Sequence, residues 1–187
     1  MDRNGIKKAI VMPFDFGGMK FEEIVKEIYS NNKSETYCEN ILEMLPIINE
    51  NMFEKVRFNE RFIFVPWISP MVEKTFDILK NAQINLIKLI PLFDNTTKSY
   101  RTKLFDCVSM LRQKVIMIHT GWGNKSWGSG LQSDVFPDLL LHFPDKIFIC
   151  AHMKEDTDLD NYRRLELLNK YHNFFVETSY VPHAKRI

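Results

Sequence analysis

Short apolar runs of strand length recur along the chain, separated by segments in which apolar residues follow a helical spacing. The runs are rich in Ile, Val and Phe and are mostly continuous rather than alternating, which is typical of strands buried on both faces of a parallel sheet. We therefore expect about six strands, at Lys8 to Phe14, Arg61 to Trp67, Leu86 to Ile90, Val115 to Ile118, Ile147 to Ala151 and Phe174 to Glu177.

The segments between these runs carry apolar residues on one face of a helix. The predicted helices are Tyr37 to Asn51, Pro70 to Ala82, Lys98 to Gln113, Ser133 to Phe143 and Asp158 to Tyr171. Pro46 should kink or divide the first of them, because proline removes a helical hydrogen bond. After position 60, each strand and its helix together span about 30 residues, the size of one βα unit.

The alternation of strands and helices predicts an α/β protein, organised as a single domain over residues 1–187. Two architectures fit this alternation, a doubly wound open sheet and part of a (β/α)₈ barrel, and periodicity alone does not separate them. In both architectures the active site lies at the carboxyl ends of the parallel strands. The polar residues that end the apolar runs are therefore the candidates for chemistry.

The composition excludes several classes of protein. Hydrophobic residues make up 45% and charged residues 26% of the 187 residues, which is ordinary globular usage. The net charge of +1 gives no electrostatic case for nucleic acid or a membrane as partner. No apolar run approaches the roughly 18 residues of a membrane-spanning helix, so we expect a cytoplasmic protein. Three cysteines without a CxxC spacing argue against a disulfide framework and a cysteine-rich zinc site.

Two histidines end consecutive predicted strands. The run that begins at Val115 ends in His119, and the run that begins at Ile147 ends in His152. Neighbouring parallel strands lie about 4.8 Å apart, so two such imidazoles can converge on one metal ion or one substrate. Either histidine alone is more simply a hydrogen-bonded residue at a strand end, whereas the pair favours a functional site.

Two further polar residues belong to apolar runs. Lys88 interrupts the run before Pro91, and a buried lysine is costly unless it is paired. It is either a functional residue that points inward or a side chain that snorkels to the solvent. Glu177 ends the last run and either orients a histidine or faces the solvent.

The loop after His119 contains Trp122 and Trp127 and four of the seven glycines, Gly121, Gly123, Gly128 and Gly130. Glycine allows close approach of a loop to a ligand, and tryptophan forms pocket walls. We interpret the segment as a loop that covers a small-molecule substrate, with a flexible surface loop as the alternative. Its glycine spacing is not a phosphate-binding fingerprint.

Taken together, these residues resemble the amidohydrolase superfamily, and within it the amidohydrolase-related group that includes aminocarboxymuconate-semialdehyde decarboxylase-like enzymes. Ile87 to Pro91 is similar to the family's fourth barrel strand, Val115 to Gly121 to its fifth, Ile149 to His152 to its sixth and Phe175 to Ser179 to its seventh. The resemblance implies an incomplete TIM-type (β/α)₈ barrel with about six parallel strands.

The resemblance also implies a metal-dependent hydrolase, in which a divalent metal, usually zinc, lowers the pKa of bound water for attack on a carbonyl-type centre. His119 would be a metal ligand, and His152 a second ligand and the catalytic acid or base. Lys88, Trp122, Trp127 and Glu177 would bind the substrate. A metal-dependent decarboxylase is the alternative reaction within the same group.

The chain departs from the family at both ends. The family's first strand supplies an HxH pair, which this sequence lacks, and its eighth strand supplies an aspartate that would follow Ile187. We therefore expect a domain truncated at both ends, whose exposed sheet edges pair with another chain, as in a homo-oligomer. A non-catalytic remnant that acts through association is the second hypothesis. A doubly wound domain that binds a small ligand through the glycine–tryptophan loop is the third.

Overall fold

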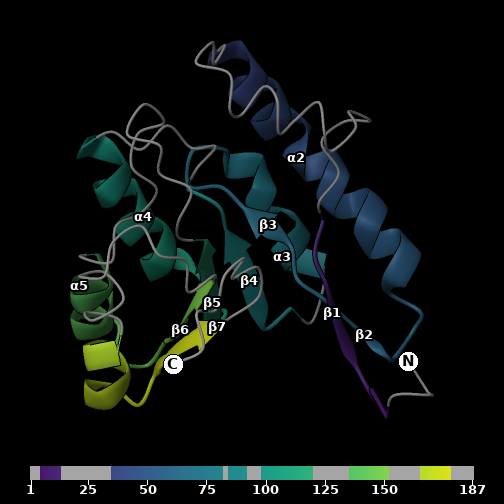
Figure 1. Ribbon diagram of the computed structural model, residues 1–187. Helices are drawn as coiled ribbons and strands as arrows, with labels where there is room; N and C mark the ends of the chain where they lie inside the picture. Colours follow the sequence, from purple (N-terminus) through teal and green to yellow (C-terminus); the bar gives the residue numbers. More distant parts are fainter. Residues whose placement is uncertain are drawn as a thin grey trace, which may run out of the picture.

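The computed structural model describes residues 5–13, 35–81, 84–91, 98–119, 135–151 and 165–177 (Figure 1). The strands are β1 (Ala9–Val11), β2 (Phe62–Phe64), β3 (Trp67–Ile68), β4 (Leu86–Leu89), β5 (Val115–His119), β6 (Ile147–Ala151) and β7 (Phe174–Glu177). The helices are α2 (Glu35–Val56), α3 (Ile78–Asn81), α4 (Lys98–Met110) and α5 (Val135–His142), with a 3-10 turn η2 (Glu73–Phe76) and a helical segment over 165–170. None of the described helices is both long and apolar enough to cross a membrane.

The described strands are all parallel and adjoin one another in chain order. One sheet has the order β3-β4-β5-β6-β7, and β1 pairs with β2. Residues 62–68 form one bent strand that links these sheets, because the Val65 N–H donates to the Val11 carbonyl at 2.9 Å and the Lys88 N–H to the Pro66 carbonyl at 2.9 Å. The order therefore runs from β1 to β7 without reversal.

This strand order settles the choice between the two architectures. A doubly wound sheet reverses its strand order at a switch point, whereas the strands of a (β/α)₈ barrel follow one another around the sheet. The described strands show no such reversal. The fold is thus α/β with parallel strands, arranged as an incomplete barrel, and this expectation from the sequence is confirmed.

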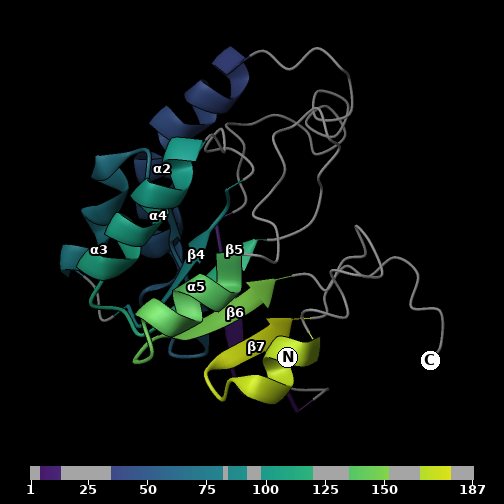
Figure 2. The same ribbon diagram turned by 90° about the vertical axis from the view of Figure 1, so that its left-hand side faces the viewer.

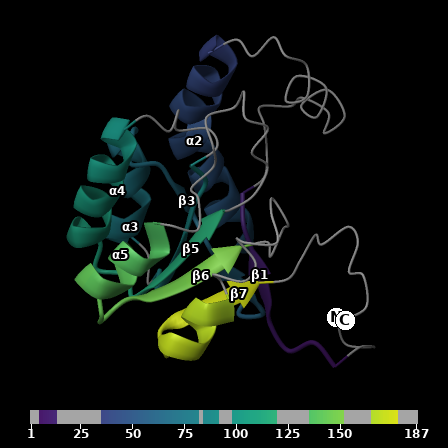
Figure 3. The same ribbon diagram turned by 60° about the vertical axis from the view of Figure 1, so that its left-hand side comes forward.

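The sheet has an outer face covered by helices and an inner face turned away from them. Figures 2 and 3 show α4 and α5 on the same side of the sheet. On that side Ile116 and Ile118 of β5 belong to one buried cluster with Leu104 of α4 and Leu139 of α5. Because side chains alternate along a strand, the residues between them point to the inner face. His119 is one of these residues.

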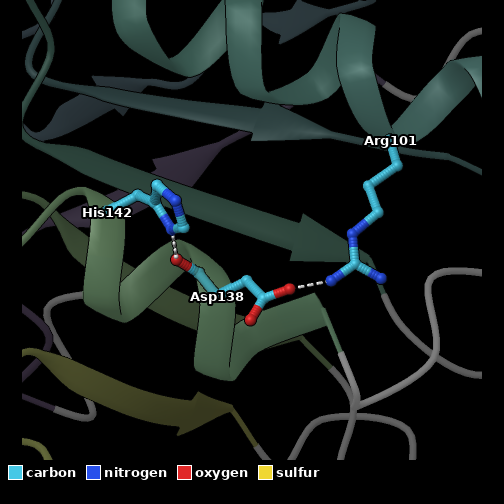
Figure 4. Close-up of polar contacts among 3 residues, drawn as sticks. All are labelled: Arg101, Asp138 and His142. Carbon is cyan, nitrogen blue, oxygen red and sulfur yellow. Dashed lines mark hydrogen bonds and ion pairs between the residues drawn. The ribbon is translucent and has the colours of Figure 1, made fainter.

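An ion pair links the two outer helices near the solvent. Arg101 of α4 pairs with Asp138 of α5, and both side chains are about half exposed (Figure 4). His142 lies one turn after Asp138, and its Nδ1 is 2.8 Å from the Asp138 carbonyl oxygen. Its ring also meets Phe105 edge to face at a centroid distance of 5.3 Å. An exposed pair of this kind contributes little to stability, so the apolar cluster beneath holds the helices.

Asn49 of α2 continues the hydrogen-bond ladder where β1 ends. Its Oδ1 accepts from the Trp67 N–H at 2.9 Å, and its Nδ2 donates to the Trp67 carbonyl at 2.8 Å. Val65 uses the same side of the strand for its bond to Val11. Asn49 is fully buried, and its amide satisfies both main-chain groups that a longer β1 would otherwise pair.

A second buried polar group closes the amino-terminal ends of the strands. Lys146 precedes β6, and its Nζ donates to the carbonyls of Leu111 at 2.6 Å and Gln113 at 3.2 Å. The Lys146 carbonyl in turn accepts from Nδ2 of Asn173 at 2.8 Å. Polar residues at this end of a barrel usually stabilise the fold rather than carry chemistry.

Two of the helix predictions need correction. Pro46 does not divide α2, which continues from Glu35 to Val56, because packing of its apolar face outweighs one missing hydrogen bond. The helix expected over Pro70 to Ala82 is instead the 3-10 turn η2 followed by the short α3. The Thr75 hydroxyl donates to the Val72 carbonyl at 2.7 Å and so competes with helical pairing there.

Candidate functional site

Three polar side chains lie on the inner face of the sheet toward the carboxyl ends of its strands. They are Lys88 of β4, His119 of β5 and Glu177 of β7. Their strand neighbours Leu89, Ile118 and Val176 pack into the outer cluster, so these three point the other way. The arrowheads of β5, β6 and β7 lie at one edge of the sheet in Figure 3, as parallel strands require.

The strand register places His119 and Glu177 at one level. His119 is aligned with Ala151 of β6, and Ala151 with Glu177 of β7. Two strand spacings separate them, which is about 10 Å along the sheet. Lys88 is aligned with Met117 of β5, which is the inner-face residue just before His119. The backbone of Lys88 therefore lies farther from the carboxyl ends of the strands than that of His119. Ala151 lies between His119 and Glu177 in the sheet, and its small side chain leaves room between the imidazole and the carboxylate.

Lys88 is a titratable group of the site whose pKa burial perturbs. It is only 5% exposed. Burial lowers the pKa of its ammonium group to about 8, and the Glu177 carboxylate opposes that decrease. A lysine with this pKa exists partly as the neutral amine near neutral pH, and perturbed groups of this kind gather at functional sites.

The inner-face residues Lys88 and Glu177 belong to strands β4 and β7 of the same sheet. Three strand spacings separate β4 from β7, or roughly 14 Å along a flat sheet. Side chains that stand perpendicular to a flat sheet would remain that far apart. In a barrel, curvature of the sheet brings inner side chains from different strands toward one another.

Trp67 of β3 is the neighbour of Lys88 on the inner face of the sheet. It is aligned with Lys88 across β3 and β4, is 1% exposed and has its Nε1 shielded from solvent. Asn49 fixes its backbone from both sides. Local sequence pattern does not indicate this position, because Trp67 stands at the end of an apolar run and only strand pairing aligns it with Lys88.

His119 occupies the carboxyl end of β5 and is half-buried. Its Nε2 is shielded from solvent. The sequence placed His119 just after its strand, whereas the structure makes it the last strand residue, held by pairing with Ala151. This pairing fixes the main chain from which the imidazole projects.

Three of the six residues proposed from the sequence, Lys88, His119 and Glu177, lie on the inner face of the sheet. His152, Trp122 and Trp127 lie outside the described residues. Within the described ranges there is no group of three or more His, Cys, Asp or Glu side chains that could hold a metal ion. Catalytic zinc sites have three protein ligands, so His119 and Glu177 do not complete such a site by themselves.

Comparisons with known proteins find little similarity. No family model matches the sequence, and no curated protein matches it. Among solved structures, a dihydroorotase from Campylobacter jejuni matches with a TM-score of 0.43 and 19% sequence identity, over 73% of this chain and 40% of that one. This chain therefore spans less than half the length of that protein. The fold assignment rests on the strand order and register described above.

Proposed function

We propose that this chain is part of a metal-dependent hydrolase of the amidohydrolase type, acting on a carbonyl-type centre of a small molecule. The observation that carries the proposal is the position of His119, at the carboxyl end of a barrel-type strand and in register with Ala151. Ala151, the last residue of β6, directly precedes His152 in the sequence, and His152 itself lies outside the described residues. The sequence resemblance supports the same activity.

The described residues have distinct roles in this proposal. Lys88 binds a carboxylate or carbonyl oxygen of the substrate when its amine is protonated, because a buried ammonium group seeks an anionic or polar partner. Glu177 orients a polar group of the substrate at the level of His119. Trp122 and Trp127 belong to the loop that covers the substrate.

The metal is the part of the proposal that the sequence resemblance supplies. His119 and His152 are its proposed ligands, and zinc is the proposed ion, since zinc accepts neutral imidazoles. When bound, such an ion makes water acidic enough to provide hydroxide near neutral pH. The described residues provide one imidazole for it, and no reaction step is assigned through the ion.

Metal analysis tests this proposal. After incubation with zinc and removal of excess ion, the wild-type chain should retain about one zinc per chain, and His119→Ala should lower the retained zinc at least about tenfold. His142→Ala is the matched control, because His142 is an exposed histidine of α5. Absence of zinc from the wild type, or equal zinc in the His119→Ala variant, would contradict the proposal.

Association with a second copy of the chain is the alternative function, and the inner face favours it. Apolar side chains on this face are exposed near both edges, with Ile10 at 48%, Ile63 at 42% and Phe175 at 49%, whereas Met117 in the middle is 6% exposed. Within the described residues, no strand pairs with the edge of β7 that faces away from β6. Exposed edges of this kind pair with other chains.

Sedimentation velocity tests the association. The wild-type chain should form a dimer or larger oligomer, and Ile63→Lys should weaken it at least about tenfold, because an unpaired charge is costly at an apolar interface. Phe58→Lys is the control, since Phe58 is 83% exposed and lies outside the strands. A monomeric wild type, or equal weakening by both substitutions, would rule out this use of the inner face.

A further inference from the structure

The chain contains two buried lysines in the described ranges with contrasting surroundings. Lys146, 7% exposed, lies at the amino-terminal end of the strands, where main-chain carbonyls accept its hydrogen bonds. Lys88, 5% exposed, lies on the inner face toward the opposite end, beside Trp67 and under the influence of the Glu177 carboxylate. Lys146 is thus held in a structural role, whereas Lys88 lies on the inner face, toward the strand ends at which barrel enzymes bind their substrates.

We propose that Lys88 is a nucleophilic amine that forms an imine with a small aldehyde or ketone bound on the inner face of the sheet. Three features support this inference independently of the proposed hydrolase activity. Lys88 is buried where substrates bind in barrel enzymes. Its register partner Trp67 is itself buried, and Glu177 of β7 supplies a carboxylate on the same face. Burial of a lysine in apolar surroundings is one of the ways in which proteins activate it as a nucleophile.

The reaction balances without any further reagent. The neutral Nζ attacks the carbonyl carbon, and one N–H proton passes to the carbonyl oxygen to give a carbinolamine. The C–O bond then breaks as the oxygen takes up a proton and leaves as water, while Nζ loses its second proton to complete the C=N bond. Glu177 serves as proton carrier in both steps and ends in its original state.

The lowered pKa of Lys88 makes the reaction selective at neutral pH. With a pKa of about 8, roughly 9% of the amine is neutral at pH 7. An ordinary exposed lysine, with a pKa of about 10.4, has roughly 0.04% of its amine neutral at that pH. Lys88 therefore presents about 200-fold more of the reactive form than a lysine on the surface.

Reductive trapping tests the inference. The full chain is treated at pH 7 with limiting acetaldehyde and cyanoborohydride, which reduces the imine to a stable ethylamine, and modified lysines are located by peptide mass spectrometry. EDTA is present, so the outcome is independent of the proposed metal. Lys88 should be ethylated at least about tenfold faster than the exposed Lys103 and Lys170.

The same labelling in concentrated urea should remove the preference, because unfolding returns Lys88 to an ordinary pKa. Two results would overturn the inference. One is labelling of Lys88 in the folded chain no faster than labelling of Lys146 or the exposed lysines. The other is a preference for Lys88 that persists in urea, since it would then owe nothing to the fold. Both outcomes are read on the wild-type chain and need no variant to fold.

Discussion

At the scale of single residues, Lys88 shows a conflict between stability and chemistry. Its pKa of about 8 in the folded chain lies below the value of about 10.4 for an unfolded lysine. Between these values the unfolded chain binds more protons than the folded one, so stability rises as the pH increases from about 8 to 10.4. Below pH 8 the folded chain carries the full cost of the buried ammonium group, roughly 3 kcal/mol.

Lys88→Met should therefore stabilise the protein at pH 7. Methionine has a similar length and removes the charge, so we expect the free energy of unfolding to increase by about 1–3 kcal/mol at pH 7 and to change little at pH 10.5. Urea denaturation at the two pH values measures this difference. Lys103→Met, at an exposed position of α4, should show no such pH dependence. A Lys88→Met variant less stable than wild type at both pH values would contradict the account.

At the scale of elements, Asn49 joins α2 to the sheet at the place where the ladder of β1 stops. Its side-chain amide forms both hydrogen bonds with Trp67, and the pair is fully enclosed. A buried N–H or carbonyl group left unsatisfied costs about 1–3 kcal/mol. The helix thus stabilises the strand that carries Trp67, and Trp67 is aligned with Lys88 of the next strand.

Asn49→Ala should lower the free energy of unfolding by about 2–4 kcal/mol, because two buried main-chain groups lose their partners. Chemical denaturation of both proteins measures the loss. Asn51→Ala is the matched control on the same helix, since Asn51 is exposed, and its effect should stay within about 0.5 kcal/mol. Similar losses for the two substitutions would show that the hydrogen bonds between Asn49 and Trp67 make no specific contribution to stability.

The elements differ in how far the sequence predicts them. The predicted runs at Leu86 to Ile90 and Ile147 to Ala151 correspond to β4 and β6, because a continuous apolar run between polar segments has few alternatives to a buried strand. The predicted run from Arg61 to Trp67 is divided into β2 and β3, since its two halves pair with different neighbours. Pairing of this kind depends on distant segments and is invisible to local periodicity.

At the scale of the whole molecule, parallel strands in chain order assemble the site from distant segments. The sequence indicates Lys88, His119 and Glu177 because each is polar and interrupts or ends an apolar run. It does not reveal that β4 and β7 bring Lys88 and Glu177 within electrostatic reach, because curvature arises from the whole sheet. Asn49 and Trp67 escape notice because their hydrogen bonds and the pairing of β3 with β4 join segments that are far apart in the sequence.

The pKa of Lys88, measured by NMR titration in the wild type and in Glu177→Gln, tests most directly whether these strands converge. The account predicts a pKa of about 8 in the wild type. Loss of the Glu177 charge should lower the pKa further, because that charge favours the ammonium form. A wild-type pKa near 10.4, or a value unaffected by Glu177→Gln, would show that Lys88 and Glu177 do not share one inner face.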